Sequence, residues 1–137
     1  MSYAGDVTPT EAYAAVTGDD DALLVDVRTR AEWTYVGVPD LAATGHRVAL
    51  VEWSRYPDGS VNEHFVDDVR AAGLEPGHPV YLLCRSGVRS QAAAAALTAA
   101  GLGPAYNVLE GFEGPHDHEG HRTVSGWKVA GLPWRQG

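Results

Sequence analysis

The sequence holds a single cysteine, Cys84, among its 137 residues. One cysteine excludes a disulfide within the chain and also excludes a Cys-x-x-Cys redox pair. A chain this poor in cysteine is typical of a reducing compartment. Any chemistry that Cys84 performs must therefore proceed without a resolving cysteine on the same chain.

Positive charge is also scarce, because 10 Lys and Arg residues stand against 18 Asp and Glu residues, a formal net charge of -8. Binding to a nucleic-acid backbone needs a basic surface, so the composition predicts no nucleic-acid partner. Net charge is an average, however, and a local basic pocket is compatible with an acidic protein.

Long hydrophobic runs are absent as well. The longest, residues 91–102, is rich in alanine and too short to span a bilayer. The start of the chain does not combine basic residues with an apolar stretch, as a secretory signal would. We therefore expect a cytoplasmic protein with no membrane partner. Its length and its apolar fraction of 45% are typical of one folded domain, which we place over residues 1–137.

The pattern of apolar residues predicts strands alternating with helices. Thr8, Pro9 and Glu11 form a capping-box signature at the start of a helix that Gly18 ends. The continuous apolar runs at 23–27 and 80–83 are typical of strands buried on both faces of a parallel sheet. The remaining expected strands are 47–53 and 106–109, and the remaining expected helices are 30–35, 62–72 and 90–100. Such alternation indicates an α/β domain with a mainly parallel sheet.

Cys84 stands at the end of the strongest predicted strand, in a loop that reads CRSGVRS over residues 84–90. Ligands of open α/β sheets bind at the carboxyl ends of strands. A loop that enters a helix directs backbone N–H groups inward, and Arg85 and Arg89 add positive charge. A thiol in such a ring ionises more readily, and the ring also attracts an anion. The alternative, a small buried hydrophobe at a strand end, does not explain the flanking arginines and glycine.

The loop resembles the active-site loop of rhodanese-domain sulfurtransferases. Residues 24–33, reading LVDVRTRAEW, are similar to the early Asp-x-Arg…Glu signature of that family. Residues 107–111 and the Gly-Leu-Pro at 131–133 are similar to its late glycine-containing turn and its closing segment. Together with the loop, these signatures occur in the family's order, and the resemblance spans nearly the whole chain.

The resemblance implies a rhodanese-like three-layer α/β fold, with a mainly parallel five-stranded sheet and helices on both faces. It also implies a persulfide intermediate on Cys84, with no metal or organic cofactor. The outer sulfur would be held by a substrate-binding loop made of Arg85, Ser86, Gly87, Val88 and Arg89. The sulfur donor would be a small anion such as thiosulfate, or another persulfide. The acceptor would be cyanide in an assay, or a thiol or a protein in the cell.

One segment departs from the family pattern. The usual Gly-His-Ile-Pro-Gly-Ala after the glutamate is replaced here by Gly-Val-Pro-Asp-Leu at residues 37–41. The histidine that this removes is interpreted as structural, so the departure leaves the predicted chemistry in place.

Asp26, Arg28 and Glu32 are interpreted as structural support for the site. Asp26 ends a buried strand, and an unpaired buried carboxylate would be costly. We expect Asp26 to accept backbone hydrogen bonds or to pair with an arginine, and we expect Arg28 to pair with Glu32.

The polar segment 114–126 is expected to be a loop within the domain. Its five potential metal ligands in six positions are His116, Asp117, His118, Glu119 and His121. They lie among glycines rather than at a fixed helical spacing, so we interpret them as a solvated loop and predict no metal site.

Three other functions remain as alternatives. A cysteine-dependent phosphatase shares this type of loop but has five residues between cysteine and arginine, whereas four separate Cys84 from Arg89. The shorter ring suits one sulfur atom. A non-catalytic binding module of the same fold often lacks the cysteine. A persulfide carrier that serves one protein partner cannot be distinguished by sequence from an enzyme that uses free thiosulfate.

Overall fold

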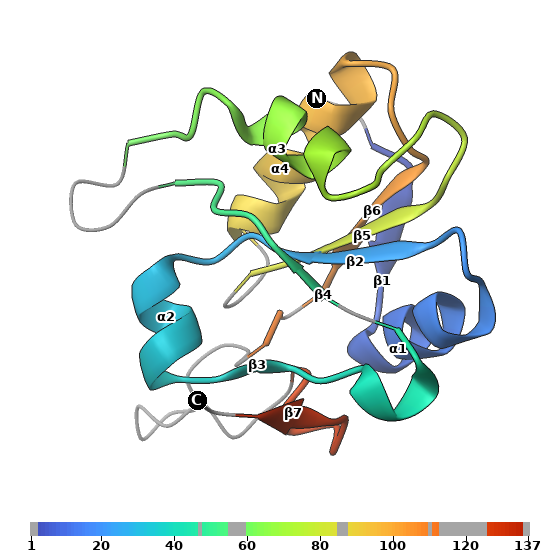
Figure 1. The fold of residues 1–137 in the computed structure, drawn as a ribbon, viewed down its shortest axis with the longest axis vertical. Coiled ribbons are helices and arrows are strands. Elements are labelled where there is room, and N and C mark those ends of the chain that lie inside the picture. Colours follow the sequence, from blue (N-terminus) through green and yellow to red (C-terminus); the bar gives the residue numbers. More distant parts are fainter. Residues whose placement is uncertain are drawn as a thin grey trace.

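The computed structural model describes residues 3–46, 48–54, 60–84, 88–109, 111–112 and 126–135 (Figure 1). Its main feature is a five-stranded parallel sheet with the strand order β1-β6-β5-β2-β4. The strands are β1 (Gly5–Val7), β2 (Leu23–Asp26), β4 (Val48–Leu50), β5 (Val80–Leu83) and β6 (Ala105–Val108). The predicted mainly parallel five-stranded sheet is confirmed.

The middle strand β5 is buried along its whole length. Its side chains alternate between two hydrophobic cores, one on each face of the sheet. Val80 and Leu82 belong to the first core, whereas Tyr81 and Leu83 belong to the second. This burial on both faces explains why the sequence of β5 is continuously apolar rather than alternating with polar residues.

Helices cover both faces of the sheet, as expected for this fold class. The helices are α1 (Pro9–Gly18), α2 (Arg30–Tyr35), α3 (Phe65–Ala71) and α4 (Val88–Ala99), with a 3₁₀ turn at Ala42–Thr44. Helices α3 and α4 contribute to the first core, and α1 contributes to the second (Figure 1). The second core is completed by Trp127, which is fully buried.

A second, two-stranded sheet pairs β3 (Val38–Pro39) with β7 (Trp134–Arg135) in antiparallel fashion. Gly37, just before β3, has a φ of +116°, and a Cβ there would lie 2.8 Å from the Arg135 carbonyl oxygen. Both the backbone conformation and the close approach therefore require glycine. Part of the segment that departs from the family pattern thus anchors the C-terminal strand.

Among the helices that the structure describes, none combines the length and the apolar character needed to cross a bilayer.

Candidate active site

Cys84 directly follows β5, at the carboxyl edge of the sheet. Its side chain is almost fully buried, with 1% exposure, and its carbonyl oxygen accepts a 2.7 Å hydrogen bond from the backbone N–H of Phe112. Helix α4 begins four residues later at Val88. The thiol is therefore placed between the end of the middle strand and the N-terminal end of a helix, where backbone N–H groups and the helix dipole favour negative charge.

A buried hydroxyl lies beside the thiol. The Sγ atom of Cys84 is 3.3 Å from the Oγ atom of Ser90, in the first turn of α4. The Ser90 hydroxyl in turn donates a short, 2.5 Å hydrogen bond to Oδ1 of Asn107 on β6. Ser90 and Asn107 are both fully buried. Among the described residues, Ser90 of α4 lies beside the sulfur, and Asn107 of β6 binds Ser90.

The carboxylate at the end of β2 forms a fully buried ion pair with Arg28. The Nε and Nη2 atoms of Arg28 donate to Asp26 at 2.9 and 2.6 Å, and the Arg28 backbone N–H donates to the same carboxylate. Nη2 also donates to the Gly37 carbonyl oxygen at 2.6 Å, and the guanidinium lies 4.2 Å from the centre of the Phe112 ring. Asp26 therefore accepts a backbone hydrogen bond and also pairs with an arginine, the two kinds of partner expected for this buried carboxylate.

Glu32 holds the start of α2 and also binds Arg89. Its backbone N–H and carboxylate complete a capping box with Thr29. The same carboxylate accepts hydrogen bonds of 2.7 and 2.9 Å from both terminal nitrogens of Arg89. One glutamate thus connects α2 to the first turn of α4, next to Cys84.

The expected pairing of Arg28 with Glu32 is wrong. Arg28 precedes α2, and its side chain turns back to Asp26, while Glu32 takes Arg89 as its partner. A guanidinium forms its best contact with a carboxylate through two parallel hydrogen bonds, and each of these two arginines makes such a contact with a different carboxylate.

The Glu32–Arg89 pair changes the ionisation of both groups. Burial by itself raises the pKa of Glu32, but the hydrogen bonds and charge of Arg89, the Thr29 N–H and the Arg28 charge together lower it below its ordinary value. Burial likewise opposes the charge on Arg89, yet Glu32 and the charges of Cys84 and Asp26 raise the Arg89 pKa. Arg89 is therefore a permanent cation within electrostatic reach of the sulfur.

Several predicted site residues lie outside the described residues. These are Arg85, Ser86 and Gly87. The histidine-rich segment 116–121, for which no metal site was predicted, lies outside them as well. Val88 opens α4. The substrate-binding role of residues 85–89 and the assignment of the histidine segment to a solvated loop stay predictions.

Ser90 and Asn107 were not singled out as site residues by the sequence. Asn107 carried a usable signal, because it is a polar residue inside the short apolar strand β6. A buried amide needs hydrogen-bond partners, and such a residue at the carboxyl edge of a sheet indicates a specific polar contact. The partner itself could not be found, because Ser90 is 17 positions away in the sequence.

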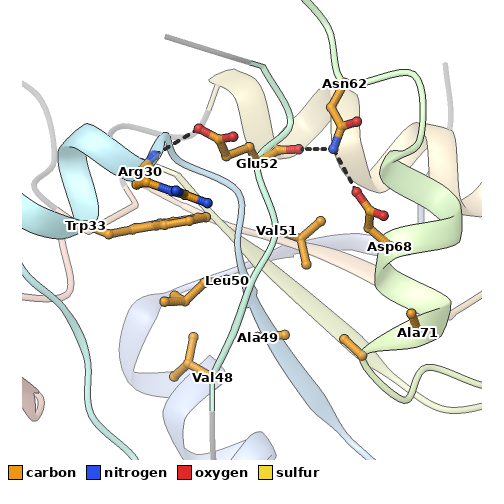
Figure 2. Close-up of a pocket in the computed structure, with 11 residues that line it drawn as sticks. Arg30, Trp33, Val48, Ala49, Leu50, Val51, Glu52, Asn62, Asp68 and Ala71 are labelled. Atoms are coloured by element: carbon orange, nitrogen blue, oxygen red, sulfur yellow. Dashed lines mark hydrogen bonds between the residues drawn. The ribbon is translucent and has the colours of Figure 1, made fainter.

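A separate pocket of about 570 Å³ lies along the edge strand β4, between α2 and α3 (Figure 2). Its polar groups largely bind one another: the Arg30 backbone N–H and the Asn62 side chain both donate to Glu52. Neither Cys84 nor either of its polar neighbours lines it. This pocket therefore does not contribute to the candidate site around the sulfur.

The parallel sheet, the helices on both faces and the cysteine at the carboxyl end of the middle strand define a rhodanese-like α/β protein. The solution structure of the polysulfide-sulfur transferase homodimer from Wolinella succinogenes has the same fold. It is 23% identical, with a TM-score of 0.63 over 96% of this chain and 77% of that one. The Arabidopsis thaliana rhodanese-like domain-containing protein 4, chloroplastic, is 27% identical over 90% of this chain and 24% of its own length.

Matches of higher sequence identity to this chain place it in one family within the rhodanese-like class. The chain belongs to the family described as the STR4 middle domain, whose model matches residues 4–137. The crystal structure of Rv0390 from M. tuberculosis is 52% identical, with a TM-score of 0.90 over 99% of this chain and all of that one. An uncharacterised protein of Rickettsia conorii is 36% identical over 94% of this chain and 95% of its own length.

Proposed function

We propose that this protein is a sulfurtransferase that carries sulfane sulfur as a persulfide on Cys84. The observation that carries the proposal is the position of the sulfur: it lies at the carboxyl end of the middle strand, in contact with a hydroxyl in the first turn of α4. Arg89, in the same turn, is close enough for the charge of Cys84 to affect its ionisation. A nucleophilic thiolate needs such an electropositive setting.

The reaction with thiosulfate proceeds in two balanced steps. The Cys84 thiolate attacks the outer sulfur of thiosulfate, so that a new sulfur–sulfur bond forms at Sγ. The bond between the two thiosulfate sulfurs breaks, and sulfite leaves with its electron pair. An acceptor nucleophile, such as cyanide or a thiolate, then attacks the outer sulfur and restores the Cys84 thiolate. This division of one transfer into two predicts ping-pong kinetics.

The loop after Cys84 supplies the stabilisation in this proposal. Backbone N–H groups of residues 85–89 would bind the outer sulfur, and the charges of Arg85 and Arg89 would attract the anionic donor. Glu32 fixes the position of Arg89 through two hydrogen bonds, and the Asp26–Arg28 pair supports the neighbouring strand end. The name of the Wolinella protein, a polysulfide-sulfur transferase, supports sulfur chemistry as one use of this fold.

The partners follow from the same chemistry. The donor is a small sulfur anion such as thiosulfate, or another persulfide, and the acceptor is cyanide, a small thiol or a protein thiol. A carrier that delivers sulfur to one protein partner differs only in the acceptor, because the persulfide on Cys84 is common to both functions.

Mass spectrometry of the intact protein tests the proposal. After incubation with thiosulfate, the protein should gain one sulfur atom, which a reductant should remove. The Cys84→Ser variant should gain none and should not transfer sulfur to cyanide, because no second cysteine is available. Activity in the variant would exclude the mechanism. Hydrolysis of an aryl phosphate by the unmodified protein would favour the phosphatase alternative.

A further inference from the structure

A continuous series of hydrogen bonds leads from Cys84 to the protein surface. Sγ of Cys84 lies 3.3 Å from the Ser90 hydroxyl, which donates to Oδ1 of Asn107. Nδ2 of Asn107 then donates to Oδ1 of Asp6 on β1 at 3.1 Å, and the Tyr3 hydroxyl donates to the same oxygen at 2.8 Å. The sulfur end of this series is fully buried, and Asp6 at the other end is exposed.

The exposed carboxylate sets the direction of every hydrogen bond in the series. An ionised carboxylate only accepts hydrogen bonds, so the Asn107 side chain must direct its NH₂ group to Asp6. Its oxygen therefore faces Ser90 and takes the hydroxyl proton. The hydrogen bond to Asp6 is the largest cause that raises the pKa of Tyr3, ahead of burial and the Asp6 charge.

This direction matters for the sulfur. While the Ser90 proton lies on the Asn107 side, the hydroxyl presents lone pairs to Cys84, which suits a neutral thiol that donates its S–H. A thiolate or a persulfide has no proton on Sγ and accepts hydrogen bonds, so a hydroxyl that donates to it stabilises it. The one proton of Ser90 can satisfy Asn107 or the sulfur, but it cannot satisfy both.

From this competition we infer that Asn107 is a positioning residue for the Ser90 hydroxyl. In the thiol state Asn107 accepts the hydroxyl proton and so directs it away from Cys84. When the sulfur becomes negative, the hydroxyl donates to Sγ instead. When the thiol loses its proton to a water molecule or a buffer base, the hydroxyl rotates, and its proton moves from the Asn107 oxygen to Sγ. The extension to the persulfide rests on the proposed function; the thiol–thiolate part does not.

Charged groups near the sulfur also act on its ionisation. Arg89 lies on α4 and is bound to Glu32 of α2, and the Asp26–Arg28 pair lies at the end of β2. Arg85 precedes α4 outside the described residues. None of these groups is altered in the variants below, so their influence is common to all of the titrations.

The test is the pH dependence of the rate at which iodoacetamide alkylates Cys84, which follows the fraction of thiolate. In Asn107→Leu the hydroxyl has lost its competing acceptor, so the titration midpoint should fall by about one pH unit. In Ser90→Ala the thiolate has lost the hydroxyl donor, so the midpoint should rise by a similar amount. The double variant should match Ser90→Ala within roughly 0.3 of a unit, because Asn107 acts only through Ser90.

Tyr3→Phe is the matched control, since it removes a hydroxyl at the far end of the same series and should leave the midpoint unchanged. Circular dichroism and thermal melting check the fold of each variant. Additive shifts in the double variant would overturn the inference. If Asn107→Leu does not fold, a midpoint that falls rather than rises in Ser90→Ala overturns it alone, because the hydroxyl would then act on the sulfur only as an acceptor.

Mass spectrometry of the same variants separates this inference from the proposed function. If the titration midpoints shift as expected but the protein gains no sulfur from thiosulfate, the inferred rotation of the Ser90 hydroxyl is supported and the proposed sulfurtransferase function is excluded. Sulfur gain with unshifted midpoints would do the reverse.

Discussion

The two carboxylate–arginine pairs near Cys84 have similar geometry but different surroundings. Asp26 and Arg28 are two residues apart in the sequence, and both side chains are fully buried. Glu32 and Arg89 are 57 residues apart, and their side chains retain 19% and 26% exposure. The first pair joins residues close in the sequence and is shielded from solvent, whereas the second joins residues far apart in the sequence and is partly exposed to solvent.

The difference in burial assigns the two pairs different tasks. A fully buried pair has lost its water, so each charge depends on the other and on the surrounding hydrogen bonds. Arg28 also binds the Gly37 carbonyl oxygen and faces the Phe112 ring, so it joins the end of β2 to two further segments. The Glu32–Arg89 pair costs less to separate, and it connects α2 to the turn that bears Ser90.

The largest effect is expected from breaking the buried pair on one side. Arg28→Met leaves the Asp26 carboxylate buried without its partner and should lower the free energy of unfolding by about 3–5 kcal/mol. Urea denaturation measures it. The double variant Asp26→Asn with Arg28→Met should be more stable than Arg28→Met, because it removes the uncompensated charge. A double variant that is less stable than Arg28→Met would show that the pair is not the cause.

A smaller loss is expected from the partly exposed pair. Glu32→Gln retains a side chain that can complete a capping box but removes the charge that faces Arg89, and should lower the free energy of unfolding by about 1 kcal/mol. Glu11→Gln is the matched control, because Glu11 occupies the same capping-box position in α1 and is exposed. Equal losses in the two variants would show that Arg89 adds nothing to the capping role of Glu32.

Local signals in the sequence predicted most of the fold. The apolar runs of β2 and β5, the capping box of α1 and the helix over residues 30–35 depend on neighbouring residues, and all are confirmed. The strand β1 was missed because Gly5–Val7 is short and has no apolar pattern of its own. Its strand character comes from pairing with β6, about one hundred residues away.

The same distinction holds at the site. The position of Cys84 at a strand end followed from the apolar run before it. The predicted pairing of Arg28 with Glu32 was wrong because spacing along the sequence does not show that the Arg28 side chain turns back to Asp26. Nor does spacing show that Arg89, which is distant in the sequence, binds Glu32. Arg89 reaches Glu32 only because β5 and β2 are neighbours in the sheet, which brings the start of α4 close to α2. Ser90 and Asn107 meet for the same kind of reason.

The smallest effect is expected in the pH dependence of the partly exposed pair. Burial by itself raises the pKa of Glu32 in the folded state, but Arg89 and the other partners outweigh burial and lower this pKa. The charged form of Glu32 therefore favours folding. That contribution is present above the unfolded pKa of about 4.3 and is lost as the pH falls through the lower, folded value. The stability difference between the unmodified protein and Glu32→Gln should therefore be largest near neutral pH and should shrink below about pH 4. Urea denaturation at several pH values measures this difference, and Glu11→Gln shows the part that arises from the capping box alone, since hydrogen bonds to Thr8 also lower the pKa of Glu11.

Added salt should reduce the Glu32→Gln effect more than the Glu11→Gln effect, because only the first contains a contact between opposite charges. A Glu32→Gln difference that grows in acid would mean that the bond to Arg89 does not stabilise the charged carboxylate, and the two pairs would then differ in kind rather than in burial.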